Sequence, residues 1–258
     1  QIKKNPRKNI VPSVNKAIDI ISVIYGQGSL TLKEITKELQ LPASTCYNIV
    51  STLEHRGMIK KDKQTNQYEL GIALIKWGLK AYHEIDLRKA AVPYLHKLVE
   101  LYNETATVTI FNQASYESIV IEVVEGNEYL RTSPKIGSRY PLHVTGAGLC
   151  FLSNLSSEQL SNYFEYIKSE PLHRPVYAEK IIAKLEGIKE NGYAVTIDEL
   201  GKNAASVGAG IKNNNENETH AAIGLSGPVE RMKRRIHEMA ATVKRFADEI
   251  SEQIYGKP

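Results

Sequence analysis

The sequence is poor in the features that mark several large classes of protein. Its 258 residues include two cysteines, Cys46 and Cys150, which form neither a disulfide framework nor a metal-binding pattern. No apolar run approaches the roughly 18 residues needed to span a bilayer. The basic segment 1–14 is followed by no apolar stretch typical of a signal peptide. We therefore expect a cytoplasmic protein without a membrane partner, long enough for two domains.

Signatures of catalysis are also scarce. His143, Cys150 and Asp198 supply the residue types of a base, a nucleophile and an orienting acid, but no motif joins them, and Cys150 stands in the apolar run "LCFL". The histidines have no metal-ligand spacing. The "GAG" triplets at 146–148 and 208–210 do not complete a dinucleotide fingerprint. We expect no catalytic residue, no metal and no cofactor.

Charge, in contrast, is concentrated at one end of the chain. Residues 1–76 hold 12 Lys and Arg against 6 Asp and Glu, a net charge of +6, whereas residues 77–258 hold 21 against 23, a net charge of −2. This asymmetry favours a module that binds a polyanion, attached to a near-neutral remainder. A basic face that binds no partner is the alternative.

Three short helices are predicted in the basic part. Segment 13–25 has Val14, Ala17, Ile18, Ile21 and Ile24 at helical spacing, with Ser13 as its expected cap. Segment 31–39, "TLKEITKEL", begins with the capping box of Thr31 and Glu34. Pro42 then separates this helix from a third, in which Cys46, Ile49, Val50 and Leu53 share the inward face.

A β-hairpin is predicted directly after the third helix. Gly57 is placed to end that helix, and two extended runs, 58–61 and 67–70, enclose the polar turn 62–66. Helices followed by such a hairpin form a winged helix-turn-helix, whose third helix enters the DNA major groove while lysines of the wing meet phosphates. A small helical bundle with a polar face is the alternative. The residues predicted to contact DNA are Ser44, Thr45, Tyr47, Asn48, Ser51, Lys60, Lys61 and Lys63.

The rest of the chain predicts helices around an antiparallel sheet. Helical patterns cover 71–103, with Ile72, Ile75, Leu79 and Tyr82 on one stripe. Strands are expected at 105–113, 118–126, 129–134, 193–198, 205–211 and 219–227. Two helices are expected at 157–168 and 177–191, and a last one at 228–254. The predicted fold class is α+β, a sensor architecture behind the DNA-binding module.

Several segments resemble the isocitrate lyase regulator (IclR) family of bacterial transcription factors. Those in the first part are "PSVNKAIDIISVI", "LTLKEITKELQLPASTCYNIVSTLEHRGMIKK" and "YELG", and those in the second are "YPLHVTGAGLCFLS", "NGYAVTIDELGKNAASVGAGI" and "AAIGLSGPVERM". The resemblance implies a winged helix-turn-helix over 1–71, a linker helix over 72–84 that also serves dimerisation, and a GAF-like effector-binding domain over 85–258. Asn48 replaces the arginine common in the family, so a different base readout is expected.

The same resemblance implies an effector pocket. Carried over by motif position, its residues are Gly146, Ala147, Thr196, Ser206, Gly224 and Ser226, with Asp198 close by. Amides of residues 146–148 at a helix start would suit an anion such as a carboxylate. A tight strand-to-helix turn without a ligand, and strand hydroxyls satisfied within the protein, are the alternatives.

The function expected from these patterns is a ligand-responsive transcription regulator, a repressor in particular, and not an enzyme. Its partners would be operator DNA, a small polar or carboxylate effector, and further copies of the chain in a dimer or tetramer. An enzyme with an accessory nucleic-acid-binding module is the alternative, and the lack of an acid–base constellation argues against it.

Overall fold

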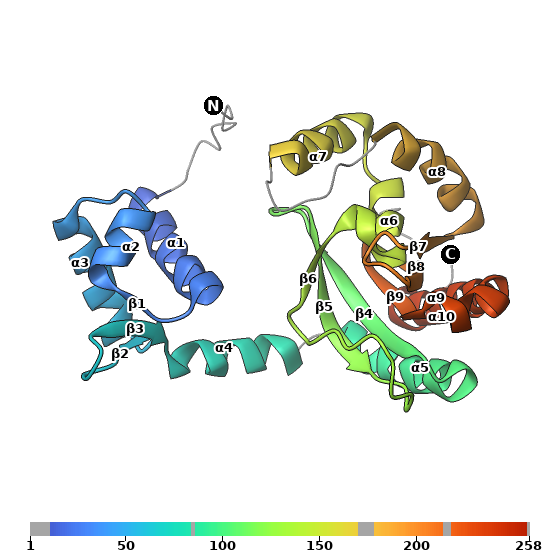
Figure 1. Ribbon diagram of the computed structural model, residues 1–258, viewed down its shortest axis with the longest axis horizontal. Helices are drawn as coiled ribbons and strands as arrows, with labels where there is room; N and C mark the ends of the chain where they lie inside the picture. Colours follow the sequence, from blue (N-terminus) through green and yellow to red (C-terminus); the bar gives the residue numbers. More distant parts are fainter. Residues whose placement is uncertain (1–10, 84–85, 170–177, 214–217, 257–258) are drawn as a thin grey trace. The chain divides into compact units, whose positions relative to one another are not determined.

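The computed structural model describes residues 11–83, 86–169, 178–213 and 218–256, and the chain divides into two compact units, 1–84 and 85–258. The predicted α+β class, with a winged helix-turn-helix in the first unit and an antiparallel sheet in the second, is confirmed (Figure 1). The predicted domain limits at 1, 84, 85 and 258 fall outside the described residues, as do the cations Lys3, Lys4, Arg7 and Lys8.

The first unit has the element order of a winged helix-turn-helix. A sheet of order β1-β3-β2 lies beside the helices, and the hairpin of β2 and the central strand β3 forms the wing. The elements are α1 (Pro12–Gln27), β1 (Leu30–Thr31), α2 (Leu32–Glu38), α3 (Ala43–His55), β2 (Ile59–Lys61), β3 (Gln67–Leu70) and α4 (Ile72–His83). Their common core consists of Ile20, Ile24, Ile35, Cys46, Val50, Leu53, Ile59 and Tyr68.

Local signals placed α2 and α3 correctly. Glu34 N donates to Thr31 Oγ1 at 3.3 Å while Thr31 N donates to Glu34 Oε2 at 2.7 Å, so the predicted capping box is present. The Thr31 amide, followed by the Thr31 hydroxyl, donates to the Glu34 carboxylate, and these two bonds lower the pKa of that carboxyl. Between the helices the chain turns at Gln40, whose φ is +51°, and Pro42 precedes the first turn of α3.

One expectation for α1, its cap, is wrong, and a second, its apolar stripe, holds for Ala17, Ile21 and Ile24 and fails for the other two residues. Ser13 does not cap the helix, because α1 begins at Pro12 after Val11, which makes no side-chain cap. Val14 and Ile18 are exposed, and the buried face is carried by Ile20 and Ile24. α1 is apolar on more than one side, and its packing against α3 and β3 decides which side is buried.

The second unit is built on one antiparallel sheet of order β6-β5-β4-β9-β8-β7. Its central strands are the longest and the most buried, since both faces are covered. The strands are β4 (Thr105–Asn112), β5 (Glu117–Val124), β6 (Arg139–Pro141), β7 (Tyr193–Ile197), β8 (Ala204–Asn213) and β9 (Glu218–Pro228).

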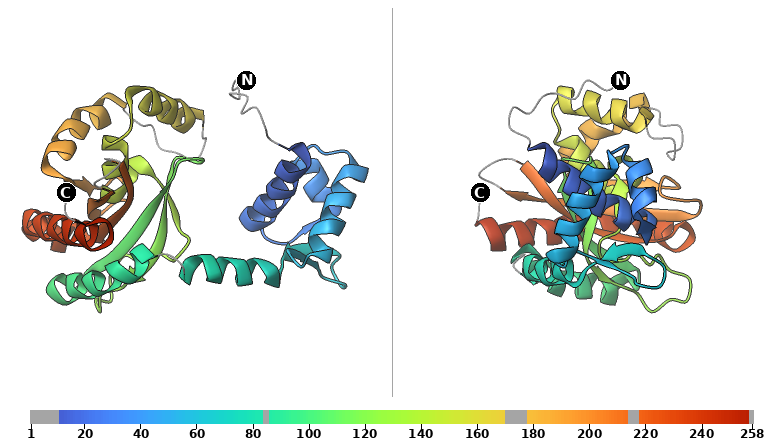
Figure 2. Two further views of the ribbon diagram at one scale, coloured as in Figure 1. Left: turned by 180° about the vertical axis from the view of Figure 1, so that it is seen from behind. Right: turned by 90° about the vertical axis from the view of Figure 1, so that its left-hand side faces the viewer.

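Helices cover the two faces of this sheet unequally (Figures 1 and 2). On one face α5 (Asp86–Tyr102) and α10 (Ile236–Tyr255) lie side by side over the main apolar core. On the other face α6 (Gly146–Ser153) packs directly on β8 and β9, and α7 (Ser157–Ser169) and α8 (Ala178–Asn191) pack around α6. Because α6 is short, it leaves part of that face uncovered by helix.

Two expectations for the second unit are wrong. Residues 129–134 form no strand; the third strand of the first group is β6, and the segment between β5 and β6 is a loop held by side-chain contacts. The last helix is interrupted: α9 (Val229–Met232) is followed by the 3-10 turn η2 (Lys233–Arg235) before α10. A second 3-10 turn, η1 (Leu142–Val144), precedes α6.

Candidate functional site

Helix α3 presents one apolar and one polar face. Cys46, Val50 and Leu53 are buried on the inner side. On the outer side Ser44, Tyr47, Asn48 and Ser51 are exposed, and Thr45 is half-buried. Asn48 stands at the middle of this outer face, where an amide can donate to and accept from a base edge. The outer face therefore has the chemistry of a recognition helix, as the spacing predicted.

The three lysines of the wing have different surroundings. Lys60 Nζ lies 2.9 Å from Glu69 Oε1, its cross-strand partner. The ammonium of Lys61 lies 5.6 Å from the centre of the Tyr68 ring. Lys63 is exposed in the turn between β2 and β3. Because an ion pair already neutralises Lys60, Lys63 and Lys61 are the cations most available for phosphates.

The turn of the wing is fixed by one carboxylate. Asp62 accepts hydrogen bonds from Gln64 N at 2.7 Å and from Thr65 N at 3.1 Å. The Thr65 amide, followed by the Gln64 amide, lowers the pKa of the Asp62 carboxyl. The bonds hold the tip that carries Lys63 in a defined shape.

Helix α4 carries an apolar stripe that nothing in its own unit covers. Ile72 is 75% exposed, and Ile75 and Leu79 are exposed beside it. The side chain of Tyr82, the fourth residue expected on this stripe, lies outside the described residues. At 3.6 residues per turn Trp77, also exposed, points to the opposite side of the helix. An exposed row of this kind is typical of a surface that meets another chain.

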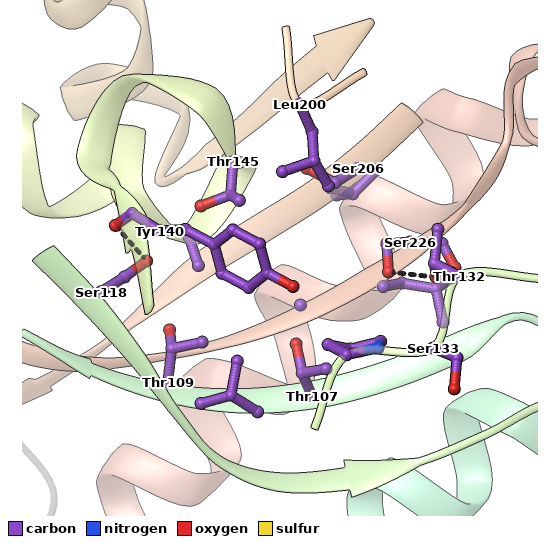
Figure 3. Close-up of a pocket in the computed structure, with 16 residues that line it drawn as sticks. Thr107, Thr109, Ser118, Thr132, Ser133, Tyr140, Thr145, Leu200, Ser206 and Ser226 are labelled. Carbon is purple, nitrogen blue, oxygen red and sulfur yellow. Dashed lines mark hydrogen bonds between the residues drawn. The ribbon is translucent and has the colours of Figure 1, made fainter. Parts of the chain in front are cut away.

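The second unit contains a cavity of about 260 Å³ on the face of the sheet that α6 leaves open (Figure 3). Its walls are the strands of the sheet, the start of α6, the loop between β5 and β6, and the loop between β7 and β8. Nine of its 16 lining residues carry a hydroxyl group. The lining residues are Thr107, Thr109, Ser118, Val120, Thr132, Ser133, Pro134, Tyr140, Thr145, Ala147, Leu200, Ser206, Val207, Gly224, Leu225 and Ser226.

The register of the sheet decides which predicted effector residues reach this cavity. Ser206 on β8 pairs with Ser226 on β9, and both line the cavity, as do Gly224 and Ala147. Gly146 and Thr196, by contrast, stand behind Ser206. Thr196 is buried, with its Oγ1 2.7 Å from Ser206 Oγ.

Asp198 is not part of the cavity wall. It is exposed in the turn after β7, with a φ of +66°, and its Oδ1 accepts a hydrogen bond from Asn203 N at 2.6 Å. This carboxylate therefore shapes the turn that brings Leu200 over the cavity.

The expectation of free amides at residues 146–148, at the start of α6, is wrong for two of the three. Gly146 N donates to Ser206 Oγ at 2.9 Å, and Gly148 N donates to Thr145 Oγ1 at 3.0 Å. These two donors are satisfied within the protein, because Thr145 caps the helix and Ser206 lies directly against its first residue.

Sequence reasoning missed several lining residues, and a signal for two of them was present. In "TATVT" threonines alternate with apolar residues, which puts Thr105, Thr107 and Thr109 on one face of a strand. Figure 3 shows the hydroxyls of Thr107 and Thr109 rising from β4 toward the ring of Tyr140. Tyr140 itself could not be foreseen, because its strand pairs with β5 only after a long loop.

That loop is tied down by polar contacts. Thr132 Oγ1 lies 2.7 Å from Ser226 Oγ, and Thr105 Oγ1 donates to Thr132 O at 2.6 Å. Glu125 accepts a hydrogen bond from Ser133 and one from Arg131, and these two bonds hold the pKa of the Glu125 carboxyl at about 2. The loop therefore forms a fixed side of the cavity.

Groups that could support other chemistry have structural roles. Cys150 is buried, its Sγ contacts Gly208 O at 3.3 Å, and burial raises the pKa of the thiol to about 12, so it is no nucleophile at neutral pH. His143 Nδ1 lies 2.6 Å from the hydroxyl of buried Tyr163. Within the described ranges no cluster of His, Cys, Asp or Glu could hold a metal ion. None of the helices found there is both long and apolar enough for a membrane span.

Comparison with protein families finds two matches along the chain. Residues 13–63 match the IclR helix-turn-helix domain. Residues 79–252 match the family described as the bacterial transcriptional regulator IclR C-terminal domain. Together the two matches cover most of both units.

Individual relatives agree with these matches over almost their full lengths. The transcriptional repressor IclR of Escherichia coli K12 is 26% identical, over 95% of this chain and 91% of that protein. The transcriptional regulator KipR of Bacillus subtilis is 28% identical, over 97% and 98%. A crystal structure of an IclR homologue from Microbacterium hydrocarbonoxydans, complexed with 4-hydroxybenzoate, shares the fold with a TM-score of 0.75 at 17% identity, over 95% of this chain and 100% of that chain.

Proposed function

The chain belongs to the IclR family of bacterial transcriptional regulators, and from this membership we propose that it is a repressor whose operator binding is modulated by a small polar metabolite. It is a DNA-binding regulator and not an enzyme, as the family and the named function of its relatives state. The observation that carries the proposal is a hydroxyl-lined cavity of about 260 Å³ in a chain that also holds a winged helix-turn-helix.

The DNA-binding half of the proposal rests on α3 and the wing. Asn48 and Tyr47, with Ser44, Thr45 and Ser51 around them, would read the major groove of operator DNA. Lys61 and Lys63, and to a lesser degree the paired Lys60, would contact phosphates. Such a partner places the protein in the cytoplasm.

The effector half rests on the cavity. Ala147, Ser206, Gly224 and Ser226 would meet the metabolite directly, and Gly146 and Thr196 would act by holding Ser206 in place. The homologue whose structure contains 4-hydroxybenzoate supports the idea that a small molecule occupies this fold. To change operator affinity ten-fold, the metabolite need only favour one arrangement of the DNA-binding modules by about 1.4 kcal/mol.

Assembly completes the proposal. One recognition helix contacts only a few base pairs. A two-fold dimer doubles the number of base pairs contacted, because it binds two half-sites one helical turn apart. The stripe of Ile72, Ile75 and Leu79 would join two copies, and two dimers could form a tetramer.

The test is a gel shift of the full chain on the DNA upstream of its own gene, repeated with a panel of metabolites. Asn48→Ala should relax base preference at one position of each half-site, at a cost of roughly 1–3 kcal/mol. Ala147→Trp and Leu200→Trp, which fill the cavity from α6 and from the loop between β7 and β8, should abolish the metabolite response and keep operator affinity. Tyr129→Trp, at a fully exposed position, is the matched control. Metabolite response retained by both cavity variants would contradict the effector site.

A further inference from the structure

The part of the cavity wall that the structure describes carries no charged residue. None of its 16 lining residues is Asp, Glu, Lys, Arg or His. A charged ligand would lose its hydration here without gaining an opposite charge, and neutral hydrogen bonds offset that loss only in part. The lining therefore favours an uncharged molecule.

Free backbone amides at the start of α6 would attract an anion, but two of these amides already have hydrogen-bond acceptors within the protein. The amides of Gly146 and Gly148 donate to Ser206 and Thr145, so neither is left for a carboxylate. Ala147 of α6 lines the cavity, and its side chain is an uncharged methyl group.

Three hydroxyls of the wall, in contrast, have no partner among the described residues: those of Thr107, Thr109 and Tyr140. Thr109 is the clearest case, because the residue is 5% exposed and its Oγ1 is buried without a hydrogen bond. A buried hydroxyl without a hydrogen bond destabilises the free protein, and a ligand that forms a hydrogen bond with it removes this penalty. Figure 3 shows Thr107 and Thr109 directed from β4 toward Tyr140, so the three groups face one space.

A hydroxyl both donates and accepts, so three of them match alternating hydroxyl or carbonyl groups of a ligand better than they match a carboxylate, which only accepts. Pro134, Val120 and Leu200 add apolar surface for a carbon skeleton. The volume, about 260 Å³, is large enough for a compound the size of a monosaccharide.

We propose that the cavity binds a small uncharged polyhydroxy compound, such as a polyol or sugar, and that Thr107, Thr109 and Tyr140 are its specificity-determining residues. This inference rests on the proposed function, since it names the chemical class of the effector. It excludes a carboxylate as the preferred ligand.

The test compares neutral and anionic molecules of the same skeleton. The pentitols ribitol, xylitol and D-arabitol are titrated into the full chain by calorimetry, beside ribonate, xylonate and D-arabinonate. At least one pentitol should bind, with a Kd at least ten-fold below that of the matching aldonate. An aldonate that binds as tightly as its pentitol, or no binding by any pentitol at millimolar concentration, overturns the proposal.

A pair of matched variants separates recognition from folding. Thr109→Val keeps the shape of the side chain and should weaken pentitol binding at least ten-fold without lowering the melting temperature of the free protein. Thr219→Val is the control. Thr219 on β9 is also 5% exposed, and its buried Oγ1 has no partner among the described residues, yet it does not line the cavity. Its pentitol binding should equal that of the parent, and equal binding by the Thr109 variant would contradict the assignment.

Operator binding without ligand is measured on the same samples. If DNA binding is intact and the pentitols fail, the ligand class is wrong and the DNA-binding function stands. If a pentitol binds and operator affinity does not change, the ligand class stands and the regulatory role of the site is wrong.

Discussion

Gly146 on α6 and Gly208 on β8 lie back to back. A Cβ added to Gly146 would stand 2.5 Å from Gly208 N, and one added to Gly208 would stand 2.4 Å from Gly146 C and 2.1 Å from Ala147 N. No side chain fits between helix and strand here, and this close approach brings Ser206 within hydrogen-bond distance of the Gly146 amide. The two glycines therefore set the depth at which α6 sits on the sheet, and with it one wall of the cavity.

Gly208→Ala should destabilise the second unit by at least about 1–3 kcal/mol, because the backbone of α6 must move away from the sheet. Thermal unfolding of the full chain measures the effect. Gly187→Ala in α8 is the control, since a Cβ there meets only Asn191 Nδ2 at 3.9 Å, and this change should instead stabilise by about 0.5–1 kcal/mol. Equal melting temperatures for the two variants would disprove the close contact.

The wing lysines should contribute unequally to DNA affinity. Lys63→Gln should lower the slope of log affinity against log salt by about 1, because one phosphate contact and its counterion release are lost. Lys60→Gln should change the slope less, since Glu69 already pairs with Lys60. Glu69→Gln should raise affinity by freeing that cation. In a variant with Lys60, Lys61 and Lys63 all changed to Gln, an unchanged salt dependence of operator binding would show that the wing does not contact DNA.

The stripe on α4 should determine the oligomeric state. Ile75→Glu with Leu79→Glu places charge in the proposed contact and should shift the full chain toward monomer in analytical ultracentrifugation, with a parallel loss of operator affinity. Trp77→Gln removes an exposed apolar residue from the opposite side of the same helix and should leave the dimer intact. A parent chain that is monomeric at micromolar concentration and still binds its operator tightly would contradict the proposed assembly.

An ion pair with a buried carboxylate should hold the loop between β5 and β6 to the end of the sheet. Arg231 donates to both carboxylate oxygens of Glu104, at 2.6 and 2.8 Å, and its Nη2 also donates to Leu130 O at 2.8 Å. Glu104 is 1% exposed, so Arg231→Met leaves a buried carboxylate without its cation and should cost about 3 kcal/mol of stability. Adding Glu104→Gln should restore part of that loss in a double-mutant cycle measured by urea unfolding. A purely additive cycle would show that the pair is not coupled.

The sequence by itself determined the DNA-binding unit and the order of elements in the sensor unit. Helical spacing alone separates the buried Cys46, Val50 and Leu53 from the exposed Tyr47 and Asn48, and the capping box alone fixes the start of α2. Such features depend on residues within a few positions of one another. They can be predicted because the forces that produce them act within one turn of a helix or across one hairpin.

Only the tertiary structure decided which residues share the cavity. Period two puts Thr107 and Thr109 on one strand face, but the register of β4, β9 and β8 decides that this face meets Ser226 and Ser206. Long-range packing also satisfies the amide of Gly146 in the second unit and selects the buried side of α1 in the first. These outcomes depend on contacts between segments tens of residues apart, whose relative positions no local pattern of the sequence specifies.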